Sequence, residues 1–208
     1  MSPKLPDTDA ETRAGGAFEG PLLLALDARR SVPAKQLSSP GPDSATVLRM
    51  LRSAVRVPDH GKRVPFRFLS IQGEARHALG ERLAGLALAR DPDAAASALE
   101  KERARFCHAP VVLVVVARLG PDAKIPEQER LLTAGCVCFA LLQAAQGLGF
   151  GATWLTGWPA YDRDVLALLG LEADEHVAGF IHIGTPRLDA PERDRPDPRT
   201  LLTPWTGT

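Results

Sequence analysis

Two arginines and a hydroxyl, Arg29, Arg30 and Ser31, follow a short segment in which leucines recur at helical spacing, and Pro33 breaks the segment. A guanidinium group is planar and permanently charged, so it can bind a phosphate through paired hydrogen bonds, and a nearby hydroxyl can add another. Arginines at the C-terminal end of a helix are also stabilised by the helix dipole without any ligand. The segment is therefore either a phosphate site or an ordinary helix end.

A second basic segment lies between residues 49 and 67. It contains six basic side chains against one acid, Asp59, together with His60, although the whole chain has 25 basic and 25 acidic residues and no net charge. A balanced chain has no overall field that would attract nucleic acid or an anionic membrane, so neither is predicted as a partner. Any anion must be met by local cations, and a solvated basic face is the alternative.

Other chemistries lack the motifs that they need. The segment GLGFG (147–151) follows a predicted helix, whereas a dinucleotide-binding loop follows a strand and opens a helix, so these glycines are predicted to end a helix. Cys136, Cys138 and the Cys107-His108 pair lack the spacing of metal ligands and are interpreted as buried structural thiols. The sequence has no GxSxG, HExxH or Walker motif. No metal site and no catalytic side chain are predicted.

The size and composition predict one soluble globular domain, since the chain has 208 residues, of which 45% are hydrophobic and 24% charged. Residues 1–19 have prolines, glycines and scattered charges with little apolar pattern, which predicts a disordered tail before a domain at 20–208. Three cysteines and no secretory signal predict a cytoplasmic location. The apolar run 131–150 includes glutamines and glycines, and is predicted to be a buried helix rather than a membrane span.

The hydrophobic periodicity predicts helices that alternate with a few strands. Helices are expected at 21–29, from Asp43 or Ser44 to Pro58, at 74–90, 93–106, 126–146 and 164–170, and strands at 66–71, 111–117, 152–156 and 179–184. In the second helix Leu48, Leu51 and Val55 are expected to form the buried stripe, and in the third Leu79, Leu83 and Leu86. The β-branched run 111–117 is typical of a central strand buried on both faces. Together these elements predict an α+β layered fold.

Four segments come in the order found in the flavin-dependent nitroreductases. They are RRS (29–31), RVPDHGKRVPFRF (56–68), AAQGLGFGATWLTG (144–157) and GFIHIGTP (179–186). The chain resembles this family, and most of all its compact bacterial branch of NAD(P)H nitroreductases, over roughly residues 20–205. The resemblance implies a three-layer sandwich with a central mixed or antiparallel sheet flanked by helices, and a homodimer with two FMN molecules at the subunit interface.

The resemblance also implies which residues contact the cofactors. The FMN contacts carried over are Arg29, Arg30 and Ser31 in the first segment, Arg56 and His60 in the second, and Trp154, Leu155 and Thr156 in the third, while Gln146, Gly147 and Gly149 match the region assigned to the nicotinamide nucleotide. Arg187 follows GTP, where many nitroreductases have a phosphate-binding cation, but a surface arginine in a loop is the commoner situation and Arg187 is left out of the predicted site.

The implied activity is an FMN-dependent NAD(P)H oxidoreductase that passes hydride through FMN to nitroaromatics, quinones or another small acceptor. The cofactor would supply most of that chemistry, which agrees with the absence of a catalytic triad. The chain departs from the family pattern at Pro33, where larger members have a cation, with Lys35 two residues later, and at Val64, Phe66 and Leu155. A flavin-binding carrier or sensor with little turnover is therefore the alternative.

Overall fold

The computed structural model describes residues 20–207, so the predicted N-terminal tail lies outside the described residues. The elements are α1 (Pro21–Asp27), η1 (Ala34–Gln36), β1 (Leu37–Ser38), α2 (Ser44–Ala54), η2 (His60–Lys62), β2 (Phe66–Gln72), α3 (Glu74–Arg90), α4 (Ala96–Ala104), β3 (Val111–Arg118), α5 (Glu127–Gly147), β4 (Gly151–Leu155), η3 (Trp158–Ala160), α6 (Arg163–Leu168), β5 (Glu175–Pro186) and η4 (Pro198–Thr200). The longer helices and strands follow the predicted order, with boundaries that differ by a few residues, and the two-residue strand β1 was not predicted.

The sheet is antiparallel throughout and is organised around β5. Its strands follow the order β1-β5-β3-β2, and β4 also pairs with β5. In β3 every residue from Val111 to Ala117 is buried. The prediction of a central strand buried on both faces is therefore confirmed.

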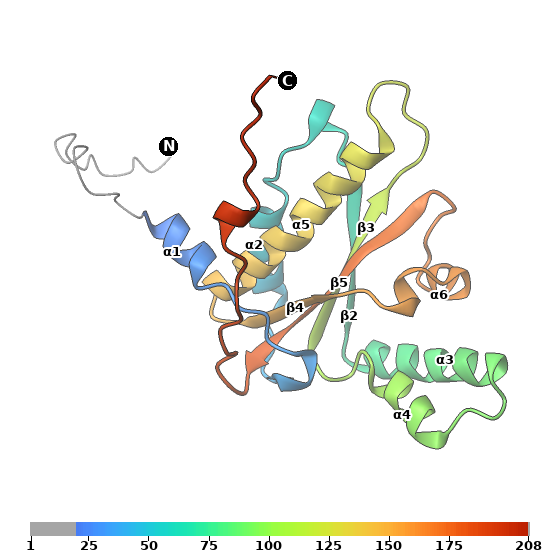
Figure 1. Ribbon diagram of the computed structural model, residues 1–208. Helices are drawn as coiled ribbons and strands as arrows, with labels where there is room; N and C mark the ends of the chain where they lie inside the picture. The colour runs from blue at the N-terminus through green and yellow to red at the C-terminus, as the bar shows by residue number, and fades with distance from the viewer. Residues whose placement is uncertain (1–19, 208) are drawn as a thin grey trace.

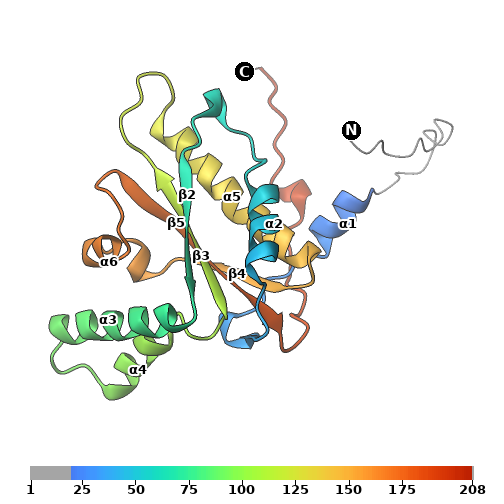
Figure 2. The ribbon, with the colours of Figure 1, turned by 180° about the vertical axis from the view of Figure 1, so that it is seen from behind.

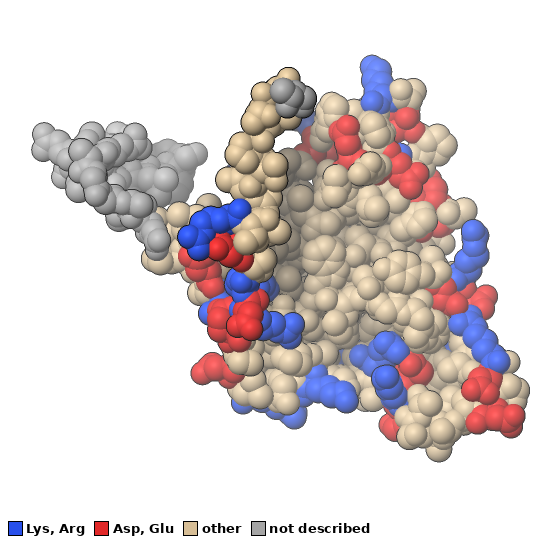
Figure 3. Space-filling model, viewed as in Figure 1, with Lys and Arg blue, Asp and Glu red and all other residues tan. Residues whose placement is uncertain are grey.

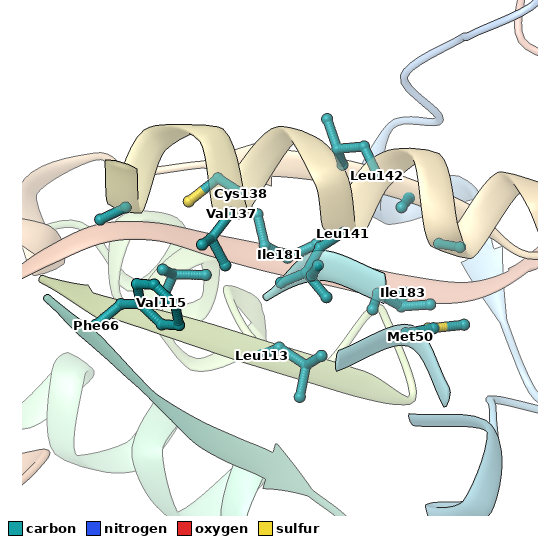
Figure 4. Packing of buried hydrophobic residues seen from close by; sticks show 14 of the residues in the cluster. Met50, Phe66, Leu113, Val115, Val137, Cys138, Leu141, Leu142, Ile181 and Ile183 are labelled. Carbon is teal, nitrogen blue, oxygen red and sulfur yellow. The ribbon is translucent and has the colours of Figure 1, made fainter. Parts of the chain in front are cut away.

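Helices cover both faces of this sheet (Figures 1 and 2). On one face α2 and α5 pack on β3 and β5, and Figure 4 shows Val137 and Leu141 of α5 against Val115, Ile181 and Ile183. On the other face α3, η3 and α6 enclose a second cluster around Val114 and Phe180, and α4 packs on α3. The α+β three-layer sandwich is confirmed.

The buried stripe of α2 differs from the predicted one. Val47, Met50 and Ala54 are buried, whereas Leu48 and Val55 are exposed. The two stripes have the same spacing and are offset by one residue, or about 100° around the helix. Leu51 of the predicted stripe is half-buried and packs against the core, whereas Leu48 and Val55 are left at the surface.

The long helix α5 ends in a Schellman motif, which confirms that the glycine-rich segment stops a helix. Gly149 has φ of +81°, its N–H donates to the Gln146 carbonyl at 3.0 Å, and Phe150 N–H donates to the Ala145 carbonyl at 2.9 Å. The chain then enters β4 directly. No helix within residues 20–207 is long and apolar enough to cross a membrane.

Gly80 is the position where α4 comes closest to α3. A Cβ atom at Gly80 would lie 2.1 Å from the Arg103 carbonyl oxygen, whereas a Cβ atom at Gly85 in the same helix would meet nothing within 4 Å. We expect Gly80→Ala to lower the free energy of unfolding by about 2 kcal/mol through overpacking. Gly85→Ala should instead raise it by up to about 1 kcal/mol, because alanine favours a helix. Urea denaturation of both variants measures the difference, and equal effects would contradict this packing.

Candidate functional site

The Arg29–Ser31 turn is held at the junction of β4 and the C-terminal end of α5. Val32 N–H donates to the Ala152 carbonyl at 3.0 Å, and Arg30 N–H donates to Gln146 Oε1 at 3.3 Å. Arg29 Nη1 donates to Ser31 Oγ at 3.1 Å, which places one guanidinium and one hydroxyl side by side. The structure therefore brings the first predicted segment together with Gln146, Gly147 and Gly149.

The Arg30 side chain is already engaged within the chain. It donates to the Asp27 carbonyl at 2.6 Å and forms an ion pair with Glu192 in the segment after β5. The Asp27 carbonyl is at the end of α1, so this side chain acts as a helix-end cation, the alternative interpretation of the segment. Arg29, which has no acidic partner within residues 20–207, is the freer of the two guanidinium groups.

A cluster of three basic side chains lies beside this turn and was not in the predicted site. Lys35 and Arg187 both act electrostatically on half-buried His108. The backbone explains their proximity, because Arg187 N–H donates to the Gln36 carbonyl at 2.9 Å and Leu37 of β1 pairs with Pro186 of β5. Among residues 20–207 neither Lys35 nor Arg187 has an ion-pair partner. We call Lys35, His108 and Arg187 the cation cluster.

Burial lowers the pKa of His108 below its ordinary value, and the charges of Lys35 and Arg187 lower it further. The imidazole therefore stays neutral at neutral pH although its neighbours are charged. The cation cluster contains no acidic group, so its positive charges repel one another. A bound anion would relieve this repulsion.

The third predicted segment is at the end of β4, near the middle of α5. The Trp154 indole N–H donates to the Ala178 carbonyl at 3.1 Å, and the ring lies over Gly179, where a Cβ atom would come within 2.1 Å of Nε1. Trp154 and Leu155 are 38% and 43% exposed. They add an apolar surface, and Thr156 follows them where the strand ends.

Arg56 and His60 are at the opposite end of α5 from the Arg29–Ser31 turn. His60 Nδ1 lies 2.7 Å from Glu129 Oε2 in the first turn of α5, and the rise of a helix puts Glu129 roughly 25 Å from Gln146. Figure 1 shows this arrangement, with η2 near one end of α5 and α1 near the other. One chain therefore does not bring the predicted second segment to the first.

An exposed apolar stripe runs along α5 between these two ends. Leu132, Cys136 and Phe139 are exposed at helical spacing, with Leu132 at 61% and Phe139 at 41%. In Figure 3 the centre of this face is free of charged side chains, which gather around its border. Cys136 was predicted to be buried; its exposure shows that α5 packs on the sheet through Val137 and Cys138 and leaves the other side uncovered.

The remaining thiols agree better with the structural interpretation. Cys138 is buried, and burial raises the pKa of its thiol to about 12, while Cys107 is half-buried. Within residues 20–207 no group of three or more His, Cys, Asp or Glu side chains could hold a metal ion.

A cavity of about 320 Å³ opens beside the Arg29–Ser31 turn. It is lined by Arg30, Gln146 and Phe150 on one side and by Leu188 and Asp189 of the C-terminal segment on the other. The cavity therefore connects the end of α5 with the chain that leaves the cation cluster.

His182 lies behind the cation cluster, in β5. It is 1% exposed and stacked on Phe106 with ring centroids 5.7 Å apart, and its Nδ1 has no hydrogen-bond partner in residues 20–207. Burial lowers the pKa of His182 to about 4, and His108 and Arg105 contribute to the shift. The folded protein therefore holds this ring neutral at neutral pH.

The neutral His182 should make the fold sensitive to acid. Because its pKa lies below the unfolded value of about 6.5, its full contribution is present above pH 6.5 and falls by up to about 3 kcal/mol as the pH drops to 4. Urea denaturation at several pH values measures this loss. The His182→Leu variant should lose less stability between pH 6.5 and 4 than the wild type, and an identical loss would contradict the assignment.

The fold and this site define an α+β protein with unneutralised cations beside an exposed apolar face. A family model described as "Nitroreductase family" matches residues 26–185, and the chain belongs to the nitroreductase family. The chain is 33% identical over 176 residues to "Putative NAD(P)H nitroreductase YdjA" of Escherichia coli (strain K12), a match that covers 84% of this chain and 94% of that protein.

Solved structures share the same fold. The nitroreductase-like family protein from Bacillus cereus superposes with a TM-score of 0.75 at 20% identity, covering 93% of this chain and all of that one. A "putative nitroreductase in complex with FMN" from Desulfovibrio desulfuricans superposes with a TM-score of 0.70 at 22% identity, covering 90% and 99% of the two chains. The predicted family is confirmed, and membership makes the chain one of a family of oxidoreductases.

Proposed function

We propose that this protein is an FMN-dependent NAD(P)H oxidoreductase that acts as a homodimer on nitroaromatics, quinones or another small acceptor. The observation that carries the proposal is that the pairing of β1 with β5 brings Lys35 and Arg187 together beside the Arg29–Ser31 turn, in a nitroreductase-family fold. The names of the relatives support it, since YdjA is named for NAD(P)H and the Desulfovibrio structure holds FMN.

The residues present fit FMN, which joins a phosphate to a flat, largely apolar ring system. A phosphate needs cations and donors, and Arg29, Ser31, Lys35 and Arg187 offer them without competition from an acidic partner within residues 20–207. A flat ring needs apolar surface, and the exposed Trp154 and Leu155 offer it at the end of β4.

When bound, FMN would supply the redox chemistry by accepting hydride from NAD(P)H and returning electrons to a second substrate. Arg29, Lys35 and Arg187 would neutralise the phosphate and hold it in place. Ser31 and Thr156 add hydroxyl donors. The chain needs no nucleophile for such a reaction, and its side chains serve to bind, orient and shield.

A second copy of the chain would complete the site. If two α5 helices pack antiparallel through the stripe of Leu132, Cys136 and Phe139, a two-fold axis brings the Gln146 end of one chain to the His60 end of the other. Arg56 and His60 of the second copy then join the turn that is roughly 25 Å away within one chain. The end of α5, with Gln146, Gly147 and Gly149, is the region proposed for the nicotinamide nucleotide.

A flavin carrier or sensor with little turnover is the second candidate. It is favoured by the positions that depart from the family pattern: Phe66 is buried in the core rather than placed for a polar contact, and Val64 is an exposed apolar residue with φ of +46°. The first candidate is nevertheless preferred, because the Escherichia coli relative at 33% identity is named as an NAD(P)H nitroreductase.

An absorbance spectrum of the purified, unsupplemented protein, repeated on the supernatant after heat denaturation, tests both candidates. We expect a flavin spectrum that is released by heating. A colourless protein that also fails to take up added FMN would contradict both. Steady-state NAD(P)H oxidation with a quinone then separates them, since rapid turnover excludes the carrier and its absence in a flavin-loaded protein excludes the enzyme.

A further inference from the structure

The cation cluster contains one member, His108, whose charge depends on its surroundings. Lys35 and Arg187 carry positive charges, whereas burial and those charges hold the half-buried imidazole of His108 neutral at neutral pH. Lys35 and Arg187 repel a proton on His108. An anion bound to them would offset this repulsion and would itself attract the proton. Protonation of His108 and binding of the anion must therefore favour each other.

The geometry of the surrounding elements leaves His108 few other partners. Ala109 and Cys107 on either side of it are fixed by Arg76 of α3, whose Nη1 donates to both carbonyls at 2.7 and 3.0 Å. Pro110 packs against Gly184, where a Cβ atom would be 2.6 Å from Pro110 Cδ. The loop before β3 is thus pinned between α3 and β5, which keeps the His108 backbone close to β1 and to the segment after β5.

The charged or titratable groups around His108 come from several segments. They are Lys35 of η1, Arg187 after β5, His182 within β5, Arg105 after α4, and Arg76 of α3, which binds the carbonyls on either side of His108. Arg105 is neutralised by Glu102, with which it makes two hydrogen bonds of 2.6 Å. Within residues 20–207 the charges that act most strongly on His108 are those of Lys35 and Arg187, so a bound anion would bring a negative charge to a basic site.

We propose that His108 couples proton uptake to phosphate binding at the cation cluster, so that the protein holds a phosphate-bearing flavin more tightly as the pH falls. The proposal rests on the proposed function for the identity of the flavin, but not for the anion site itself. The protonated imidazole becomes a third cation for the phosphate, and the neutral imidazole contributes no charge. The affinity for the anion is then higher at pH values below the pKa that His108 has in the complex. It falls as the pH rises above that pKa.

Sulfate tests the coupling without a flavin, because its charge does not change between about pH 5 and 8 and the titration of His108 is then the only variable of interest. The His108 imidazole signal is followed by NMR with and without sulfate and assigned by comparison with the His108→Gln variant. We expect sulfate to move the titration midpoint of His108 to higher pH. An unchanged midpoint would overturn the proposal.

FMN and riboflavin then test the consequence for the cofactor, since riboflavin lacks the phosphate. We expect the ratio of FMN dissociation constants, His108→Gln over wild type, to rise from about 1 at pH 8 to about 10 at pH 6, following one proton. The riboflavin ratio should stay near 1. The phosphate group of FMN titrates near pH 6, but this affects both proteins equally and cancels in the ratio.

A fixed charge at this position is the matched control. In the His108→Lys variant the affinity for FMN should stay high at pH 8, where the wild type no longer has the extra affinity that protonated His108 provides. A flat FMN ratio in His108→Gln, with FMN bound, would overturn the inference and leave the proposed function standing. If sulfate shifts the titration of His108 but the protein binds neither flavin, the anion coupling stands and the proposed function is contradicted.

Discussion

Replacing Phe139 with aspartate should convert the proposed homodimer into a monomer that binds almost no FMN. Phe139 is 41% exposed in the apolar stripe on α5, and in a two-fold interface through this stripe the substitution buries two carboxylates without partners. Each costs several kcal/mol, so we expect the dimer dissociation constant to rise by at least ~1,000-fold. Sedimentation of the purified variant measures this change.

Loss of flavin should accompany the loss of the dimer, because in the proposed dimer Arg56 and His60 reach the Arg29–Ser31 turn from the second chain. Leu88 is the matched control: it is 44% exposed on α3, on the opposite face of the sheet, and Leu88→Asp should leave both oligomeric state and FMN content unchanged. A dimeric, flavin-loaded Phe139→Asp variant would show that another surface forms the interface.

The double variant Lys35→Glu, Arg187→Glu should lower the affinity for FMN by at least ~1,000-fold. Each change removes a charge-assisted hydrogen bond worth about 1.5–3 kcal/mol and puts a negative charge beside the phosphate. The affinity for riboflavin, which has no phosphate, should fall less than ~10-fold. Fluorescence quenching titrations with both flavins measure the two constants.

The control for this charge reversal is Arg82→Glu with Lys101→Glu. Both residues are exposed on α3 and α4, away from the cation cluster, and the change in net charge is the same. This control should bind FMN like the wild type. Equal losses in the two double variants would indicate a general field effect, and equal losses for FMN and riboflavin would place the phosphate elsewhere.

Most of the fold could be predicted because its strongest signals are local. The unbroken β-branched run 111–117 marked the central strand, and Gly149 marked the end of α5. The register of α2 was wrong because two apolar stripes of equal spacing lie one residue apart, and only packing against α5 and the sheet decides between them. Local pattern gives the period of a helix but not always its buried side.

The candidate site was only partly predictable, since it depends on contacts between distant segments. Lys35 and Arg187 are visible in the sequence, but what joins them is β1, a strand of two residues that has no pattern of its own. His108 was read only as a possible metal ligand beside Cys107. Its proximity to Lys35 and Arg187 depends on the pairing of β5 with both β1 and β3.

The proposed function predicts one result most directly. FMN-loaded protein is mixed with NADH or NADPH in the absence of oxygen, and the absorbance of the bound flavin is followed through a single turnover. We expect the visible absorbance band of the bound flavin to disappear after the nucleotide is mixed in and to return when a quinone is added. A bound flavin that neither nucleotide bleaches would contradict an NAD(P)H oxidoreductase.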